Sequence, residues 1–338
     1  MIKIKLYEPT RHRNECAFRA YIWAQHVLRD IGIEFTTGDT YDYALVNTFY
    51  NCDKKLPLDQ AVEKGLDYLS KITGDYILLD GQDSTSLIGA AELLRGSNAK
   101  FLLKNTLLND WNLYKQGWHN GRIYWGPGEY KVPDIDELKG KIKLSGTNWV
   151  GTIRPKWLKY NSDKSYDVSC MFGWGDNLNY EHGILTSNYY DDHRKFLLDR
   201  LENTKYNVLR RERGIRIPQQ QFYENMYNSK IVTAPIGYGE MAVRDIEAAS
   251  FGSVLIKPDM SYIKSVPFLY EDDETYIACK YDWSDIEEKI DYVLSNWTHL
   301  QDKLTYNMRK RFEDQYNDER LATHLYNIFA NLDGIEHE

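Results

Sequence analysis

The chain has 338 residues, a formal net charge of -8 and a sequence pI of about 5.6. Hydrophobic residues make up 42% and charged residues 27%, an ordinary globular balance with enough apolar side chains for two cores. Because single domains commonly span about 100–200 residues, two domains are expected. The acidic balance argues against broad, charge-driven nucleic-acid binding, which needs a basic surface, but it does not exclude a local basic cleft.

Cysteine usage and the N-terminus indicate the compartment. The four cysteines lie far apart and form no CxxC pair, which predicts buried thiols in a reducing environment. They are Cys16, Cys52, Cys170 and Cys279. The first residues, MIKIKLYEP, predict a strand and not a signal peptide, because no apolar region follows them. No run approaches the roughly 18 apolar residues of a membrane span. We therefore expect a soluble, cytoplasmic protein.

Strand-like and helical runs alternate through the first 104 residues. Strands are predicted at 2–8, 43–47, 76–80 and 100–104, and helices at 15–32, 58–72 and 84–96. Asp83 and Ser84 are plausible caps of the third helix. This alternation is typical of an α/β domain with a mostly parallel sheet and helices on both faces.

From about residue 105 to 160 the sequence reads as loops rich in Trp, Tyr and Gly, and then the alternation returns. Strands are predicted at 166–174, 205–209, 230–235, 253–258 and 275–279, and helices at 191–204, 218–229, from about 240, and at 283–297, 298–316 and 318–332. The predicted domains are 1–160 and 161–315, both Rossmann-like. A C-terminal helix within 316–338 could pack back on the first domain.

A glycine turn, GYG at 237–239, separates one predicted strand from the helix that starts near Glu240. Glu240, Arg244, Glu247 and Phe251 would share one helix face by their spacing. A solvated face with weak ion pairs is one interpretation. The alternative is a ligand site. Glycines let a backbone approach phosphate closely, a helix N-terminus attracts anions, and a carboxylate two turns later can accept hydrogen bonds from ribose hydroxyls.

The same residues resemble a known family. Gly237-Tyr238-Gly239-Glu240, then Arg244-Asp245, Glu247-Ala248 and Gly252, resemble the donor-site segment of GT-B glycosyltransferases of the group 1, spore-maturation (CgeB-like) type. The resemblance implies the GT-B architecture, with two Rossmann-like domains facing a cleft and C-terminal helices. It implies that residues 1–160 bind the acceptor and that residues 161–315 bind the nucleotide-sugar donor. It also implies that Glu247 binds the donor ribose. Arg244 either belongs to the donor site or pairs with Glu240 or Glu247 as a scaffold residue.

Further candidates complete the predicted site. The donor-binding residues are predicted to be Gly237, Tyr238, Gly239, Arg194, Arg211, Arg244, Glu247 and Lys257. Arginines can neutralise a leaving diphosphate, although surface charge is the alternative for Arg194 and Arg211. Asp83 and Glu240 are the catalytic candidates, with Asp83 as general base or, alternatively, as helix cap. Arg11 and Arg13 could meet donor phosphates or an acidic acceptor, or form a solvated basic loop.

No metal site is expected. Asp134-Ile135-Asp136 forms a DxD, but it follows Pro133 and is better explained as a helix start. His119 and His182 lack metal-ligand spacing.

We expect no cofactor besides a nucleoside-diphosphate sugar, UDP- or GDP-linked, as donor substrate. The acceptor would be a glycan, glycoprotein, lipid or small molecule, and the net charge does not favour a nucleic-acid acceptor.

The sequence therefore predicts a metal-independent hexosyl- or pentosyltransferase. The rival interpretations are a nucleotide-sugar epimerase or phosphorylase of the same architecture, or a non-catalytic nucleotide-sugar binding module. The donor sugar, its base, the acceptor and the stereochemical outcome stay open.

Overall fold

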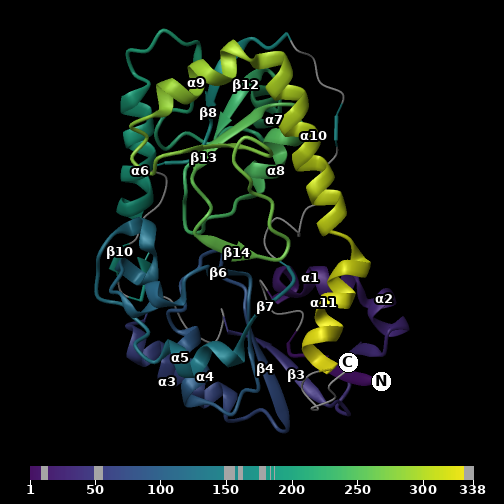
Figure 1. Cartoon of the computed structure of the whole chain (residues 1–338). Helices are drawn as coiled ribbons and strands as arrows, with labels where there is room; N and C mark the ends of the chain where they lie inside the picture. Colours follow the sequence, from purple (N-terminus) through teal and green to yellow (C-terminus); the bar gives the residue numbers. More distant parts are fainter. Residues whose placement is uncertain are drawn as a thin grey trace.

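The computed structural model describes residues 1–8, 14–48, 56–147, 157–158, 163–174, 180–182, 184–185 and 187–330. These residues form two α/β halves, drawn one above the other in Figure 1. We call the half built on strands β1–β5 and β7 the first half, and the half built on β8, β11–β13 and β15 the second half.

The first half is built on a six-stranded sheet in the order β2-β1-β3-β4-β5-β7, and all neighbouring strands run parallel. The strands are β1 (Ile2–Leu6), β2 (Ile33–Thr36), β3 (Tyr43–Asn47), β4 (Asp75–Asp80), β5 (Leu102–Lys104) and β7 (Ile142–Leu144). Side chains alternate between the faces, so that Val46 of β3 packs in one core and Leu45 in another. The predicted parallel sheet is confirmed.

Helices cover both faces of this sheet. The face of Val46 receives α3 (Leu58–Leu69), α4 (Ala90–Gly96) and α5 (Ile135–Leu138). The opposite face receives α1 (Asn14–Trp23), α2 (Gln25–Asp30) and α11 (Asp318–Ala330). The segment between β6 and β7 carries short 3-10 turns at Trp111–Lys115, His119–Gly121, Ile123–Trp125 and Lys139–Lys141, as its Gly-rich, irregular sequence predicted.

The second half repeats the plan with a five-stranded parallel sheet in the order β11-β8-β12-β13-β15. Its strands are β8 (Tyr166–Cys170), β11 (Val208–Arg210), β12 (Ser229–Thr233), β13 (Val254–Pro258) and β15 (Ile277–Cys279). One face packs on α6 (Ser187–Arg200), α9 (Ile286–Ser295) and α10 (Trp297–Gln315). The other packs on α7 (Gln219–Tyr227), α8 (Val243–Ser250) and the end of α10. A short antiparallel pair, β9 (Tyr180–Glu181) and β10 (Ile184–Leu185), precedes α6.

Two features join the halves. Strand β6 (Thr106–Leu108) pairs antiparallel with β14 (Ile263–Ser265), which brings segments from both halves into one ribbon at the centre of Figure 1. Helix α11 then returns to the first half, where Leu325 and Phe329 are buried in the core of β1 and β3. His324 Nε2 lies 2.8 Å from the carbonyl oxygen of Leu144, at the end of β7. The halves therefore cannot separate without breaking a strand pair or an apolar core.

Several predicted helix boundaries are wrong, for backbone reasons. The helix predicted over 15–32 is two helices, because Ala24 has φ -82° and ψ 0°. The helix predicted over 84–96 begins only at Ala90, since Gly89 has φ 77°. The helix predicted from Glu240 begins at Val243, because Ala242 is extended, with φ -133° and ψ 150°. Strands β2, β6, β7 and β14 were not predicted.

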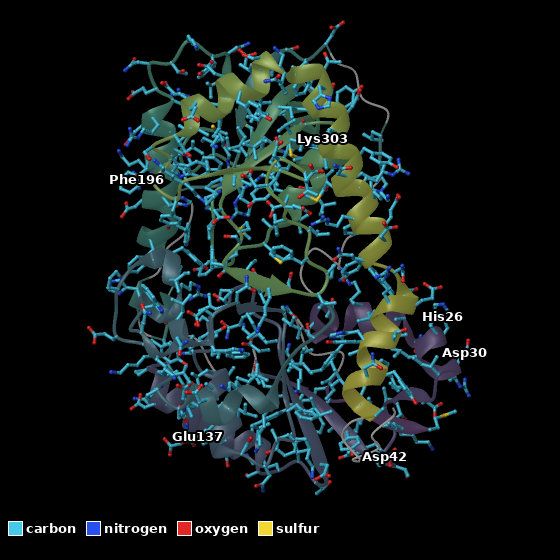
Figure 2. The ribbon with its side chains drawn as sticks, viewed as in Figure 1. His26, Asp30, Asp42, Glu137, Phe196 and Lys303 are labelled. Atoms are coloured by element: carbon cyan, nitrogen blue, oxygen red, sulfur yellow. The ribbon has the colours of Figure 1, made fainter. Side chains whose placement is uncertain are left out.

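Charged side chains dominate the periphery. Asp30, Asp42 and Glu137 are exposed on the outside of the first half (Figure 2), in keeping with the acidic composition. Cys170 and Cys279 are buried free thiols, as predicted, whereas Cys52 and the side chain of Cys16 lie outside the described residues. Within the described ranges, no helix has both the length and the apolar character needed to cross a bilayer.

Candidate active site

The glycine turn follows β12 at the carboxyl end of the second sheet, four residues after Thr233. Gly237 and Gly239 do not have positive φ, so an unusual backbone conformation does not explain them. Space does. A Cβ on Gly239 would lie 2.1 Å from the carbonyl oxygen of Asp83 in the first half, and a Cβ on Gly237 would lie 2.9 Å from Arg194 Nη2. Glycine is therefore required at 239, which packs against backbone, whereas the Arg194 side chain beside Gly237 can move.

Glu240 fastens this turn to the first half. Its carboxylate accepts hydrogen bonds from the backbone N–H of Thr85, at 3.1 Å, and from the Thr85 hydroxyl, at 2.7 Å. The side chain is fully buried, and burial raises its pKa. In this conformation the carboxylate has no exposed surface and contacts the first half, and its catalytic role stays a prediction. Glu240 also precedes α8, so it does not share a helix face with Arg244 and Glu247.

The backbone of Tyr238 is held from the same side. Its carbonyl oxygen accepts hydrogen bonds from Arg122 Nε, at 2.9 Å, and from the Tyr124 hydroxyl, at 2.8 Å. The Arg122 guanidinium lies over the Trp125 ring, with its carbon 4.4 Å from the ring centroid. Arg122 and Tyr124 were not predicted as site residues, because their segment has the sequence of a loop. A basic residue among aromatics and glycines, NGRIYWG, was the available signal.

Three arginines from three elements of the second half were predicted for the donor site. Arg194 of α6 lies against Gly237, donates to the carbonyl of Gly173 and stacks over Tyr190, at 4.8 Å. Arg211 directly follows β11 and donates to the carbonyl of Ile215. Both side chains lie near carboxyl ends of strands, where open α/β sheets bind their ligands.

Arg244, the third arginine, sits in the first turn of α8. Its Nε–H is buried and has no hydrogen-bond acceptor among the described residues. Burial lowers the pKa of Arg244, whereas the nearby carboxylates of Asp245 and Glu247 raise it. Among the described residues, Arg244 forms an ion pair with neither Glu240 nor Glu247, so the proposed scaffold pairing is wrong.

The remaining candidate carboxylates, Glu247 and Asp83, are both half-buried. Glu247 of α8 is half-buried and accepts a hydrogen bond from the Tyr223 hydroxyl at 3.2 Å, and burial raises its pKa. Asp83 is half-buried in the segment after β4, with its backbone against Gly239. It does not cap the next helix, because α4 begins six residues beyond Ser84, after Gly89.

Lys257 belongs to a buried ion pair. Its side chain has no exposed surface, and its ammonium pairs with the buried Asp245 carboxylate at 3.2 Å. Asp245 in turn accepts the backbone N–H of Ala242 and the Tyr270 hydroxyl, which fixes the start of α8. Lys257 therefore supports the start of α8 beyond the turn, and its donor-binding role stays a prediction. Arg11 and Arg13 lie outside the described residues.

The DxD residues are engaged in ion pairs. Asp134 binds Arg95 through two hydrogen bonds of 2.6 Å each, and Asp136 pairs with Lys115 and Lys139. Helix α5 begins directly after Asp134, as the sequence predicted, although its side chain does not cap the helix. Across the described ranges, no three His, Cys, Asp or Glu side chains gather in a way that could hold a metal ion.

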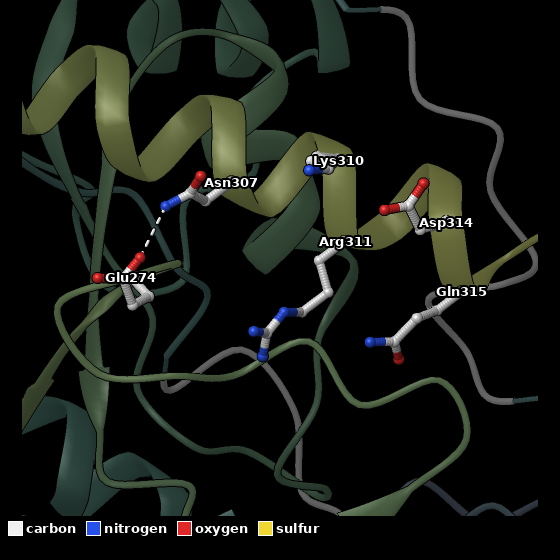
Figure 3. Close-up of a pocket in the computed structure, with 6 residues that line it drawn as sticks. All are labelled: Glu274, Asn307, Lys310, Arg311, Asp314 and Gln315. Atoms are coloured by element: carbon white, nitrogen blue, oxygen red, sulfur yellow. Dashed lines mark hydrogen bonds between the residues drawn. The ribbon is translucent and has the colours of Figure 1, made fainter.

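A polar hollow lies apart from the glycine turn, between α10 and the loop before β15 (Figure 3). Its volume is about 280 Å³, and it is lined by Glu274, Asn307, Lys310, Arg311, Asp314 and Gln315. Asn307 donates to Glu274 at 2.9 Å, and Arg311 pairs with Glu271. These partners fasten the loop to α10. A larger hollow of about 540 Å³ lies beside β14.

Comparison with solved structures extends over the whole chain. Sucrose-phosphate synthase from Thermosynechococcus elongatus is similar with a TM-score of 0.51 and 11% identity, covering 99% of this chain and 100% of that one. A glycosyltransferase from Rickettsia africae gives 0.43 and 12%, covering 99% of both chains. Anabaena HepE in complex with UDP-glucose gives 0.40 and 10%, covering 98% and 100%.

At such low identities the likeness concerns the fold alone. The first comparison confirms the predicted α/β fold with GT-B architecture. No protein-family model matches the sequence. No curated protein matches it either.

Proposed function

We propose that the chain is a glycosyltransferase that moves a sugar from a nucleoside-diphosphate sugar to an acceptor. The second half would bind the donor and the first half the acceptor. The observation that carries this proposal is the glycine turn after β12, which lies between the halves with Arg194 against Gly237. Ligands of open α/β sheets bind at this edge, and two-domain enclosure limits hydrolysis of an activated donor.

The transfer reaction requires positive charge near the leaving diphosphate. When the anomeric C–O bond breaks, the diphosphate takes the electron pair and its negative charge grows. Arg244 supports this role, because it is half-buried in the first turn of α8, directly beyond the glycine turn, where a guanidinium can meet phosphate oxygens. Arg194 and Arg211 would add charge from neighbouring elements. The half-buried Glu247 could accept hydrogen bonds from the ribose diol.

Finer assignments follow from the resemblance of the turn and helix to the donor segment of the spore-maturation type. We propose a UDP- or GDP-linked hexose or pentose as donor, and a glycan, glycoprotein, lipid or small molecule as acceptor, in the cytoplasm. We propose further that no divalent ion is required, because arginines and backbone N–H groups would neutralise the diphosphate. Turnover in excess EDTA should then stay within about twofold of the control.

The test is release of free nucleoside diphosphate from UDP-glucose, UDP-N-acetylglucosamine and GDP-mannose, with and without a panel of acceptors. Acceptor-dependent release is expected. Formation of an epimer without acceptor would favour an epimerase, and binding without turnover would favour a binding module. Arg244→Gln should abolish most of the release. The matched control is Arg309→Gln, which removes an exposed arginine paired with Glu313 on α10 and should leave release unchanged.

A further inference from the structure

We infer that Arg122 and Tyr124 of the first half are positioning residues for the glycine turn of the second half. They would aim the backbone of the turn, so that the donor site takes its working shape only while the halves are in contact. The expected effect on nucleotide affinity rests on the function proposed above. The expected effect on the conformation of the turn does not depend on that function.

Two hydrogen bonds from the first half fix the peptide group between Tyr238 and Gly239. Both donors to the Tyr238 carbonyl oxygen come from the first half, 116 and 114 residues away along the chain. A carbonyl oxygen has two lone pairs, so these two hydrogen bonds use its full accepting capacity. The peptide bond between Tyr238 and Gly239 is trans. The N–H of Gly239 therefore points opposite to this carbonyl, and fixing the carbonyl also sets the direction of that N–H.

The Arg122 side chain is held rigidly. Arg122 is only 2% exposed, and its guanidinium lies over Trp125. Trp125 in turn stacks on Tyr189 of α6, with ring centroids 4.9 Å apart and ring planes 12° apart. An arginine held on an aromatic face and hydrogen-bonded loses little further entropy on binding, so its donor stays in place.

Tyr238 has contacts with both halves. Its ring packs on Tyr190 of α6, at 5.2 Å between centroids, and the Arg122 guanidinium carbon lies 5.9 Å from its centroid. Its carbonyl oxygen accepts hydrogen bonds from the first half. The next residues also contact the first half, since Gly239 packs on Asp83 and the Glu240 carboxylate accepts from Thr85. The orientation of the turn's backbone is therefore set by the first half.

The cleanest variant is Tyr124→Phe, which removes one hydroxyl donor and keeps the ring. Its matched control is Tyr41→Phe, because the Tyr41 hydroxyl also donates to a backbone carbonyl, that of Thr73, at 2.8 Å. Arg122→Met removes the second donor, and Arg122→Lys restores a charge without the planar fork. If Arg122→Met fails to fold, Tyr124→Phe still decides the outcome.

Two measurements are made on the full chain: deuterium exchange of peptides covering 237–243, and the Kd for UDP by calorimetry. For Tyr124→Phe we expect exchange at the turn to rise, and UDP affinity to fall, by roughly 3- to 10-fold, with exchange elsewhere unchanged. Arg122→Met should have a larger effect, and Arg122→Lys should recover part of it. A general rise in exchange across both halves would instead indicate a merely structural role and overturn the inference.

The inference is also overturned if Tyr124→Phe and Arg122→Met behave like Tyr41→Phe in both measurements. A change in exchange at the turn with unaltered UDP affinity would refute the link to the donor site. If the unaltered chain binds neither UDP nor GDP, the proposed function fails, while exchange at the turn still tests the positioning role by itself.

Discussion

Each half of the molecule buries one lysine–aspartate pair near the carboxyl edge of its sheet. In the first half, Lys104 ends β5 and its ammonium lies 2.9 Å from the Asp80 carboxylate. In the second half, Lys257 of β13 lies 3.2 Å from Asp245. All four side chains have 0% exposure, so the two pairs are equally removed from water.

Their surroundings differ. Asp245 also accepts the Ala242 N–H, at 3.0 Å, and the Tyr270 hydroxyl, so it connects β13, the start of α8 and the loop after β14. Within the described part of the chain, Asp80 Oδ1 accepts a hydrogen bond from the Gln82 N–H, whereas Asp80 Oδ2 and the Lys104 ammonium, although close, have no hydrogen-bond partner. Burying two charges is costly unless hydrogen bonds complete the site. The second pair is therefore an integral part of the scaffold under the glycine turn, whereas the first is held mainly by its own attraction.

Asp245→Asn should have the largest effect on stability. It leaves the Lys257 ammonium buried without a counter-charge, which costs about 3–5 kcal/mol in comparable pairs. Urea denaturation at pH 7 measures this. The control is Asp291→Asn, which breaks an exposed pair with Lys205 and should cost about 1 kcal/mol or less. An equal, small loss for both variants would show that the buried pair does not stabilise the second half.

The second half should also be the more acid-sensitive, because of His193. This histidine is buried between Tyr281 and Trp283, and burial lowers its pKa from 6.5 to about 4. The unfolded chain therefore binds a proton below about pH 6.5 that the folded chain accepts only near pH 4. Stability should fall as the pH falls through this window, by at most about 3 kcal/mol. His193→Gln should flatten this part of the curve; an unchanged slope would contradict the assignment.

Replacing both partners tests the comparison directly. Asp80→Leu with Lys104→Met removes the first pair together with its desolvation cost, and stability should change by about 1 kcal/mol or less, or rise. Asp245→Leu with Lys257→Met should cost about 2 kcal/mol, because the Ala242 N–H and the Tyr270 hydroxyl lose their acceptor. Equal results in urea denaturation for the two double variants would abolish the distinction between the pairs.

Gly239→Ala tests the contact between the halves with a smaller effect. The added Cβ meets the Asp83 carbonyl oxygen at 2.1 Å, so the turn or the first half must move, at about 1–2 kcal/mol. Melting temperature and UDP affinity should both fall. Gly140→Ala is the control, because no heavy atom lies within 4 Å of a Cβ there. An unchanged melting temperature for Gly239→Ala would mean that the halves are not in contact at this turn in solution.

The architecture was predictable from the sequence because its signals are local. Apolar runs and helical periodicity indicated β3, β4, β13 and the three C-terminal helices nearly to their ends. The three-residue strands β6, β7 and β14 carry too little pattern to be recognised alone. Strands β6 and β14 in particular exist because each supplies the other's hydrogen bonds across 155 residues of chain from Leu108 to Ile263.

The candidate site also has local features, which the sequence indicates, and features that depend on distant residues, which it does not. The glycine turn and the arginines that follow strands stand out by residue type and position, so the sequence indicated them. The contacts of Glu240 and Lys257 could not be predicted, because each depends on a partner. Glu240 accepts from Thr85, 155 residues away, and Lys257 pairs with Asp245, which also accepts from other donors. Arg122 was missed for the same reason, since its bond to Tyr238 spans 116 residues.

The central claim is that the turn between the halves receives the diphosphate of a sugar nucleotide. A crystal structure of the chain soaked with UDP tests it most directly. The account predicts the diphosphate against the backbone of 237–239, with a phosphate oxygen accepting from Arg244 and the ribose hydroxyls on Glu247. UDP bound elsewhere, for example in the hollow beside β14, with Arg244 and Glu247 untouched, would contradict it.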